Sequence, residues 1–434
     1  MRPKGAPVRV GFLGCGTIEG TAARILLDLA RELEERAGAP IALARIAVRD
    51  AQKPRSVDLP PELYTTDAVS VVEDPSIDIV VEAMGGLEPA RELVLRALRS
   101  GKHVVTANKE LLSTVGPELT AAAVEAGVDL VFEASVAGGI PIVRGIKESL
   151  AGDRVRRVMG IVNGTTNFVL TRMSERGESF SEALSEARRL GYAESDPSAD
   201  VDGHDAAAKL AILASLAFNA RVAASDVHRE GIGSVGRDDI VAAHDLGYEI
   251  KLIAVAEVDH DGAVSARVHP SMLPRTHPLA SVRDVFNAVF VEGEQVGELM
   301  FLGRGAGGGP TGSAVVGDVV EVAHNIVSGG RTSPLVARER TTITPIEETR
   351  ARYYIVLSVR DEPGVLAEVA SAFAHHGISI SSVRQEGFGD EATLILITHT
   401  GAERHHRATL ADLAALEVVK SVESTMRVLG TEEG

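Results

Sequence analysis

Residues Val8-Arg-Val-Gly-Phe-Leu-Gly-Cys-Gly-Thr-Ile-Glu-Gly20 decide how the N-terminal part of the chain folds. The first six residues are mostly apolar and predict a buried strand, and the glycines at 14 and 16 predict a tight turn. Apolar residues then recur at helical spacing, which predicts a helix over 17–36. A glycine turn between a strand and a helix is the context in which such a motif binds a dinucleotide.

The turn has most of the features of a pyrophosphate site. Gly14 permits the tight turn, and Gly16 lets the backbone approach a pyrophosphate at the helix N-terminus, where Thr17 and Ile18 begin the helix. The third glycine of the usual G-x-G-x-x-G motif is replaced by Glu19. A carboxylate beside a pyrophosphate is unfavourable unless it points away, so this departure weakens the motif and its consequence cannot be read from the sequence. A purely structural glycine turn is the alternative for this motif taken alone.

Further apolar runs extend this pattern into a doubly wound parallel α/β sheet. Runs at 41–48, 77–83 and 103–106 alternate with helical segments such as 89–100. The second run ends at Arg49, where an arginine can pair with a 2′-phosphate and a carboxylate would instead bind a 2′-hydroxyl. The sequence therefore predicts NADP as the preferred cofactor over NAD, with a solvated basic turn as the alternative.

Pattern changes along the chain predict four segments. Residues 1–140 form the NAD(P)-binding Rossmann domain, which the helix 311–327 joins. Residues 141–310 mix strands with long helices and form an α+β catalytic and dimerisation domain. A polar linker follows at 328–350. Residues 351–430 show the order strand–helix–strand–strand–helix–strand, which is typical of a ferredoxin-like plait.

Composition excludes several classes of function. The chain has 434 residues, which is too long for one ordinary core. Its formal net charge of −17 argues against nucleic acid as a partner. No apolar run is long enough to cross a bilayer, so no membrane partner is expected. The single cysteine, Cys15, excludes an internal disulfide and favours a reducing, cytoplasmic location.

One lysine follows a strand of the predicted parallel sheet, in Thr106-Ala-Asn-Lys109. Ligands of open α/β sheets bind beyond the carboxyl ends of the strands. Lys109 and Thr106 are therefore placed to reach a cofactor, and Lys109 also a substrate. A solvated lysine is the alternative.

A second lysine ends the acidic segment from Gly191 to Lys209. Asp205 and Lys209 are four residues apart and share one face of the helix predicted at 204–218. Ordinary helix-start chemistry, with Asp202 as the N-cap, is the alternative for the acids. It does not explain a lysine among Ala and Leu, where desolvation lowers a lysine pKa and suits proton transfer. Five acids of this segment suit an ammonium-bearing substrate: Glu194, Asp196, Asp200, Asp202 and Asp205.

Four motifs in order resemble the homoserine dehydrogenase family over nearly the whole chain. They are Val105-Thr-Ala-Asn-Lys109, Glu133-Ala-Ser-Val-Ala-Gly-Gly-Ile-Pro141, Asn163-Gly-Thr-Thr-Asn167, and Leu190-Gly-Tyr-Ala-Glu194 with Lys209-Leu210. The resemblance implies an NAD(P)-dependent oxidoreductase that interconverts L-aspartate 4-semialdehyde and L-homoserine. That reaction belongs to the biosynthesis of threonine, methionine and isoleucine.

The resemblance also implies roles for single residues. Lys209 is similar to the family's proton donor, and Lys109 to its second active-site lysine. The implied substrate-binding residues are Glu194, Asp200, Asp205, Tyr192, Gly164 and Thr165. Gly307 joins the expected cofactor contacts Gly14, Gly16, Thr17, Ile18, Arg49, Thr106 and Lys109. A monovalent cation, usually sodium, is expected at Glu133 and the backbone carbonyls of Val136, Gly138 and Ile140.

The C-terminal plait resembles an ACT domain. Its loop Asp361-Glu-Pro-Gly364 matches the first loop of that family, where amino-acid effectors bind, often across an interface between domains. We expect L-threonine as the effector, because it is the end product of the pathway. Pairing of plaits predicts a homodimer or homotetramer. A plait that serves only as a dimer contact is the alternative.

Two rival functions remain to be weighed. An aldehyde dehydrogenase acting on an acyl-phosphate-linked substrate needs a nucleophilic cysteine, but Cys15 lies in the predicted phosphate turn. A catalytically inactive amino-acid sensor that keeps the ACT domain is the second rival. The presence of both lysines and all the candidate acids argues against it.

Overall fold

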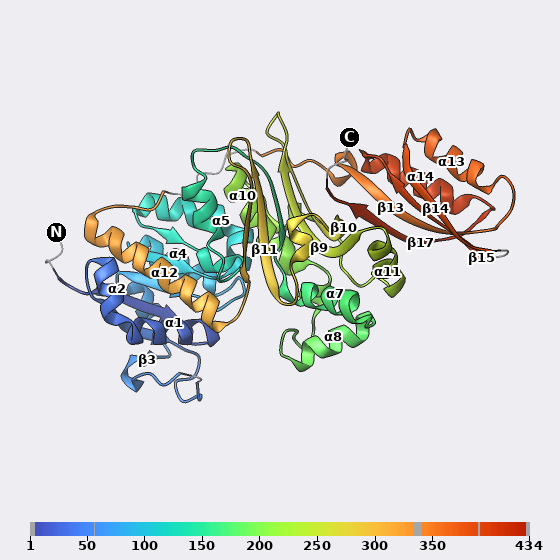
Figure 1. Cartoon of the computed structure of the whole chain (residues 1–434). Coiled ribbons are helices and arrows are strands. Elements are labelled where there is room, and N and C mark those ends of the chain that lie inside the picture. Colours follow the sequence, from blue (N-terminus) through green and yellow to red (C-terminus); the bar gives the residue numbers. More distant parts are fainter. Residues whose placement is uncertain (1–4, 56, 334–340, 389–390, 431–434) are drawn as a thin grey trace. The chain divides into compact units, whose positions relative to one another are not determined.

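The computed structural model describes residues 5–55, 57–333, 341–388 and 391–430 (Figure 1). The chain forms two compact units. The first comprises residues 1–158, 208–227 and 286–341, and the second comprises residues 159–207, 228–285 and 342–434.

A six-stranded parallel sheet forms the centre of the first unit. Its order is β3-β2-β1-β4-β5-β6, so the order reverses between β1 and β4. This confirms the predicted doubly wound sheet, in which ligands bind where the order reverses. The strands are β1 (Val8–Leu13), β2 (Ile41–Ala47), β3 (Tyr64–Thr65), β4 (Ile79–Glu82), β5 (His103–Thr106) and β6 (Leu130–Val131).

Helices on the two faces of this sheet bury separate apolar cores. Side chains of α1 (Thr17–Asp28), α2 (Ala30–Ala37) and α12 (Gly308–Ser328) share one core. Side chains of α3 (Ala68–Glu73), α4 (Ala90–Arg99) and α5 (Lys109–Ala126) share the other. The prediction of a single helix at 17–36 is wrong in one respect. The backbone leaves the helical conformation at Leu29, whose side chain is exposed, so two shorter helices replace one.

Helix α12 lies against α1, although almost 300 residues separate them along the chain (Figure 1). A Cβ added to Gly312 would lie 3.0 Å from the Thr21 Cγ2 atom, and one added to Gly308 would lie 2.8 Å from Thr17 Cγ2. Glycine is therefore needed on this face of α12 because the helices approach closely. The contact brings the glycine-rich start of α12 to the first turn of α1.

The first unit also contains elements that do not belong to this sheet. Strands β11 (Phe286–Gly293) and β12 (Gly297–Arg304) form an antiparallel pair. The short helix α6 (Ile142–Arg144) follows a 3₁₀ turn at Glu133–Ser135. Strand β7 (Val155–Ile161) runs from the first unit into the second, and α10 (His204–Phe218) runs from the second into the first.

The second unit is built on a sheet with the order β9-β10-β17-β13-β15-β14. Strands β10 and β17 pair in parallel through Ser271 with Arg427 and Met272 with Val428. Short strands β8 and β16 pair with β10 and β13. The strands are β8 (His228–Arg229), β9 (Tyr248–Val258), β10 (Val264–Pro274), β13 (Arg350–Val359), β14 (Ile380–Phe388), β15 (Glu391–Thr398), β16 (Gly401–Ala402) and β17 (Val419–Val428). Helices α7 (Gly164–Arg176), α8 (Phe180–Arg189), α9 (Ser198–Val201) and α11 (Arg237–Asp245) complete the part that precedes β13.

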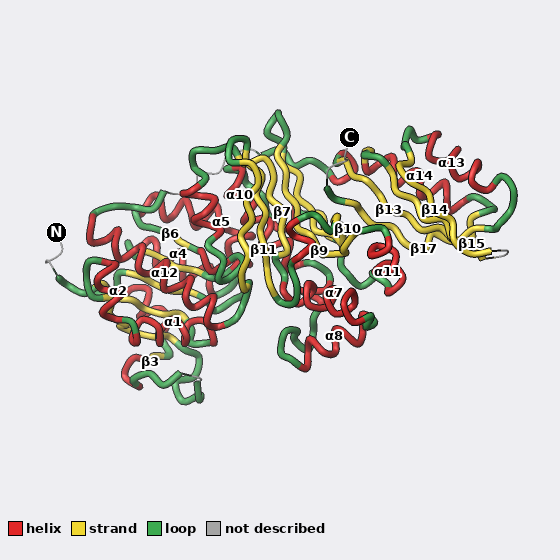
Figure 2. The backbone as a smooth tube through the Cα atoms, in the orientation of Figure 1, coloured by secondary structure: helices red, strands yellow, loops and turns green. Residues whose placement is uncertain are grey.

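The C-terminal segment of this unit forms the predicted ferredoxin-like plait. Helices α13 (Val365–His375) and α14 (Glu403–Ala415) cover one face of its four strands (Figure 2). Side chains of the strands and helices bury a common apolar core, which includes Ile355, Phe373 and Leu413. The parallel pairing of β10 with β17 was not predicted, because a strand order cannot be read from periodicity.

No helix in the described part of the chain is long and apolar enough to cross a membrane.

Candidate active site

The glycine turn after β1 has the conformation that the sequence predicts. Gly14 has a φ of 112°, in the left-handed region that favours glycine, and its N–H donates to the Ala47 carbonyl at 2.9 Å. A Cβ on Gly14 would collide with the Glu19 carboxylate. Gly16 precedes α1, and its N–H donates to Glu19 Oε2 at 3.2 Å. The Glu19 side chain therefore folds back onto the turn, which answers the question that the sequence leaves open.

Burial explains how a carboxyl group can lie in this position. Glu19 is only 4 % exposed, and this burial raises the pKa of Glu19 to about 7. The carboxyl group is therefore neutral below this pH and ionised above it. A neutral carboxyl group in the turn does not repel an anion, whereas an ionised one does.

The end of β2 carries two arginines with different surroundings. The Arg55 guanidinium donates to the carbonyls of Asp50 at 2.5 Å and Lys53 at 2.8 Å, and it lies 4.6 Å from the centre of the Tyr64 ring. Arg55 therefore orders the loop that follows β2. Arg49, in contrast, is exposed two residues after the strand ends, where the sequence predicts contact with a 2′-phosphate.

Three residues tie together the ends of β4 and β5. Glu82 is fully buried and accepts from Thr106 Oγ1 at 2.7 Å and from Asn108 Nδ2 at 3.3 Å. Burial raises the pKa of Glu82. Asn108 Oδ1 in turn accepts from the Leu111 N–H at 3.1 Å and so begins α5. Lys109 is the first residue of that helix, half-buried, with its position fixed by these contacts.

Sequence reasoning missed Glu82. The signal was available, since an acid closes the buried apolar run at the carboxyl end of the strand that neighbours β1.

Helix α10 begins at His204, as predicted. Both Asp205 and Lys209 are buried, with 8 % and 9 % of their surface exposed, so the expected burial of this lysine is confirmed. The N-cap role considered for Asp202 is wrong. Gly203 directly precedes the helix, and Asp202 is instead the C-cap residue that follows the short helix α9.

Asn163 was quoted in a motif without a role, and the structure places it at the centre of the acidic segment. Its Nδ2 atom donates to Asp200 Oδ1 at 2.6 Å and to Asp205 Oδ2 at 2.9 Å. Its Oδ1 atom accepts from the Thr166 N–H at 2.9 Å and caps α7. One amide thus brings two carboxylates together, which is an arrangement that suits a cationic ligand.

Other predicted substrate residues lie in the same unit. Thr165 Oγ1 donates to the Tyr192 carbonyl at 2.7 Å, and the Tyr192 ring meets the Phe168 ring edge-on at 5.1 Å. Gly164 is the first residue of α7. These contacts hold the loop after α8 against the start of α7. Glu194 lies on that loop and is exposed.

The two lysines both belong to the first unit. Leu112 and Ser113 of α5, and Ile212 and Ser215 of α10, line one cavity of about 320 Å³ with mostly apolar walls. Lys109 and Lys209 each precede a lining residue by three positions, which is about one helical turn. The two lysines therefore lie one turn from the same cavity.

The segment expected to hold a cation makes an unusual turn. Ala137 and Gly138 both have positive φ values, 54° and 48°. Among the described residues, no hydrogen bond reaches the carbonyls of Val136 and Gly138, whereas the Ile140 carbonyl accepts from Ile142 at 2.8 Å. Carbonyl oxygens of this kind fit a hard cation.

The Glu133 side chain is engaged at the start of the next helix. Its side-chain oxygens accept from the N–H groups of Val143 at 2.8 Å and Arg144 at 2.9 Å, so they serve the start of α6.

Gly307 lies close to the glycine turn. It precedes α12 with a φ of 113°, and the next residue, Gly308, packs against Thr17 of α1. The predicted cofactor residues after β1 and before α12 are therefore neighbours.

Comparison with protein families gives matches along the chain. The family model described as homoserine dehydrogenase matches residues 141–320, the one described as its NAD-binding domain matches residues 14–133, and an ACT domain matches residues 353–418.

Individual relatives agree with these models. A homoserine dehydrogenase of Corynebacterium glutamicum is 50 % identical over 428 residues, which is 98 % of this chain and 96 % of that protein. One of Bacillus subtilis is 43 % identical and covers 98 % of both chains. The crystal structure of a homoserine dehydrogenase from Thiobacillus denitrificans matches with a TM-score of 0.91 at 40 % identity, and it also covers 98 % of both chains.

The parallel dinucleotide-type sheet, the acidic segment before a buried lysine, and these matches over the full length lead to one conclusion. The chain belongs to the homoserine dehydrogenase family, and it is an NAD(P)-dependent oxidoreductase acting on a CH–OH group, with an ACT domain at residues 353–418.

Proposed function

We propose that the protein interconverts L-aspartate 4-semialdehyde and L-homoserine, in the biosynthesis of threonine, methionine and isoleucine, with Lys209 as the proton donor. The observation that carries this proposal is the buried Lys209, one helical turn after Asp205. Asp205 and Asp200 both accept from the Asn163 amide. The two acids are therefore held together, and Asp205 lies on the same helix as Lys209.

The nicotinamide cofactor supplies the hydride that adds to the aldehyde carbon. Lys209 donates its proton to the carbonyl oxygen as negative charge develops there, and it takes a proton from the hydroxyl group in the reverse direction. Lys109 adds positive charge near the reacting oxygen. Asp200 and Asp205, with Glu194, hold the substrate ammonium, and Gly164, Thr165 and Tyr192 bind the rest of the amino acid.

Replacing Lys209 with Met should reduce kcat by about 10²–10⁴-fold, because a general acid is lost while the apolar stem is kept. Cofactor affinity, measured by fluorescence titration, should remain close to that of the unmodified enzyme.

The matched control for this variant is Lys102→Met. Lys102 is also buried, but its Nζ atom donates to the Ile77 carbonyl at 3.0 Å, in the turn before β4. This control should lose thermal stability and keep its kcat. A kcat for Lys209→Met within tenfold of wild type would remove Lys209 from the mechanism.

NADP is the proposed cofactor, held by Gly14, Gly16, Thr17, Ile18, Thr106, Lys109 and Gly307, with Arg49 at the 2′-phosphate. Arg49 supports this preference because it stands exposed at the end of β2. A structural neighbour, a hyperthermophilic archaeal homoserine dehydrogenase mutant, was solved in complex with NADPH. It matches with a TM-score of 0.62 at 28 % identity over 73 % of this chain.

Arg49→Gln should weaken NADP binding by roughly 10- to 100-fold, because one charge-assisted pair contributes about 1.5–3 kcal/mol. NAD binding should change little, since NAD lacks the 2′-phosphate. Isothermal titration with both cofactors measures the two effects. Arg45→Gln is the control, because Arg45 is also exposed on β2 but lies before its end. Equal weakening of NADP and NAD in Arg49→Gln would show that Arg49 does not contact the 2′-phosphate.

Glu19 should make cofactor binding depend on pH. Its carboxyl group, with a pKa of about 7, loses its proton as the pH rises and then opposes the pyrophosphate. NAD affinity in the wild type should therefore fall between pH 6 and pH 8, and in Glu19→Gln it should be flat and higher at pH 8. NAD is the probe because it has no 2′-phosphate to titrate. The same fall in both proteins would exclude Glu19 as its cause.

A sodium ion is proposed at the backbone carbonyls of Glu133, Val136, Gly138 and Ile140. The free carbonyls of Val136 and Gly138 support it, and a bound cation would stabilise the left-handed turn between them. We further propose that the protein acts in the cytoplasm as a homodimer or homotetramer.

The ACT domain is proposed to bind an amino-acid effector, L-threonine, at the loop before α13. Gly364 supports this placement, because it is exposed, has a φ of 104° and directly precedes the helix. Asp361 Oδ1 accepts from Gln385 Nε2 at 3.1 Å, which holds the loop to β14. The exposed N–H groups at this helix start can bind the effector carboxylate.

Threonine should inhibit the intact enzyme, and Gly364→Ala should lose this inhibition because the Cβ obstructs the ligand and strains the loop. The matched control is Gly377→Ala at the other end of α13. Gly377 is also exposed, has a φ of 68°, and a Cβ there would meet no neighbour within 4 Å. It should stay inhibited. If calorimetry shows no binding of threonine or another aspartate-derived amino acid to the intact protein, the domain is not a sensor for them.

A further inference from the structure

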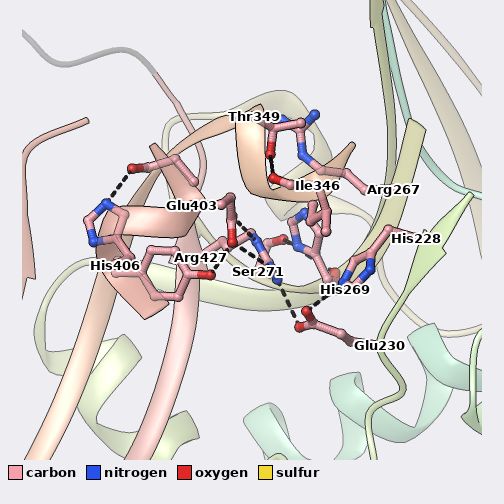
Figure 3. Close-up of polar contacts among 12 residues, drawn as sticks. His228, Glu230, Arg267, His269, Ser271, Ile346, Thr349, Glu403, His406 and Arg427 are labelled. Atoms are coloured by element: carbon pink, nitrogen blue, oxygen red, sulfur yellow. Dashed lines mark hydrogen bonds and ion pairs between the residues drawn. The ribbon is translucent and has the colours of Figure 1, made fainter. Parts of the chain in front are cut away.

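A buried charged cluster lies where β10 and β17 pair in the second unit, around Arg427 (Figure 3). Arg427 is only 3 % exposed. Its guanidinium donates from Nε and Nη2 to the two Glu403 oxygens at 2.6 and 3.1 Å, and from Nη1 to Glu230 Oε2 at 2.8 Å. One guanidinium therefore binds two carboxylates from different parts of the unit.

The partner Glu403 belongs to the ACT domain itself. It starts α14, is fully buried and accepts from Tyr353 Oη at 2.7 Å. The Arg427 guanidinium also lies 5.5 Å from the centre of the Tyr353 ring. These contacts hold Arg427 in place within the plait independently of Glu230.

The partner Glu230 comes from outside the ACT domain. It directly follows β8, its N–H donates to the Val268 carbonyl at 2.8 Å, and its Oε1 atom lies 2.9 Å from His228 Nε2. Burial opposes its ionisation, but His228 and Arg427 together hold the pKa of Glu230 below its usual range. Glu230 is therefore a charged group shared between the catalytic part and the plait.

The residues after Glu230 pack against the segment that carries the proposed substrate acids. The Ile232 N–H donates to the Val201 carbonyl at 2.9 Å. A Cβ on Gly231 would lie 2.9 Å from the Asp202 Cα atom, closer than real side chains come. Val201 ends α9, the helix that contains Asp200. A displacement of Glu230 therefore reaches the segment that contains Asp200 through the backbone contacts of Gly231 and Ile232.

We infer that Glu230 is a positioning residue for the substrate. Arg427, on the last strand of the plait that contains the ACT domain, holds Glu230 so that the segment 198–205 presents its carboxylates. This inference rests on the proposed role of Asp200 and Asp205 in binding the substrate ammonium. It also gives the ACT domain a direct contact with the catalytic part, since a shift of β17 moves the partner of Glu230.

The test uses the full chain with Glu230→Gln. Glutamine keeps the size of the side chain and removes its charge, while Arg427 keeps Glu403 as its partner. The KM for homoserine should rise by roughly 2- to 30-fold, the range for changes that act through a chain of contacts. The KM for NADP and the kcat should stay near the wild-type values, a split that a loss of folded protein does not produce. Glu230→Asp, which keeps the charge but reaches less far, should raise the KM for homoserine by a smaller factor.

Glu257→Gln is the matched control. Glu257 is about as exposed as Glu230, at 35 % against 43 % of the side chain, and its Oε2 atom accepts from the buried Arg267 at 3.0 Å. Both residues of this pair lie on β9 and β10, outside the ACT domain itself. The control variant should keep the wild-type KM for homoserine.

Three results would overturn the inference. An unchanged KM for homoserine in Glu230→Gln, with an active wild type, removes Glu230 as a positioning residue and leaves the proposed function intact. Equal increases in Glu230→Gln and Glu257→Gln show a general effect of lost charge. A wild type that does not oxidise homoserine overturns the proposed function, and the inference with it. In the expected case, threonine should also inhibit Glu230→Gln less than the control.

Discussion

A carboxylate that is buried away from water must accept hydrogen bonds from the protein. This requirement determines how the elements around the candidate site are connected. An unpaired buried charge is costly, so each acid fixes the elements that supply its partners. Asp318 on α12 is almost fully buried and accepts from the Glu133 N–H at 2.8 Å and from Arg144. It thereby joins a helix near the end of the first unit to the turn before α6. Glu82 joins the ends of β4 and β5 in the same way. Glu403 joins the start of α14 to β17.

The same requirement distinguishes structural acids from those available to a ligand. Glu82 and Glu403 each receive two or more donors from side chains or backbone. Asp200 and Asp205 instead share one amide of Asn163, and Asp200 is only half-buried. Two carboxylates held by one amide concentrate negative charge, which suits a cationic ligand. Their surroundings therefore suit binding, whereas those of Glu82 suit the alignment of strands.

Much of the fold followed from local patterns. Periodicity predicted β1, β5 and α10 to within a residue or two, and the order of elements predicted the plait. The break at Leu29 escaped prediction, since an apolar residue at a regular position looked buried and is not. The orientation of the Glu19 side chain was not predicted either. It depends on the burial of the carboxyl group, which cannot be read from the sequence. The roles of Asn163 and Glu230 needed contacts with residues that lie 37 or more positions away. Family motifs marked Asn163 as notable without saying what it binds, and nothing in the sequence singled out Glu230.

Helix α10 sets the spacing between Asp205 and Lys209 along its axis. A helix rises about 1.5 Å per residue, so Asp205 and Lys209 are about 6 Å apart along its axis, on one face. In their proposed roles one binds the ammonium and the other the oxygen at the far end of a four-carbon amino acid. Those two atoms are joined by four bonds of roughly 1.5 Å each, a comparable span when the chain is extended. Because a helix is stiff, the Cα atoms of the two residues keep their separation, and only the side chains can adjust. In the proposed roles, the backbone therefore sets the length of amino alcohol that fits best between the two side chains.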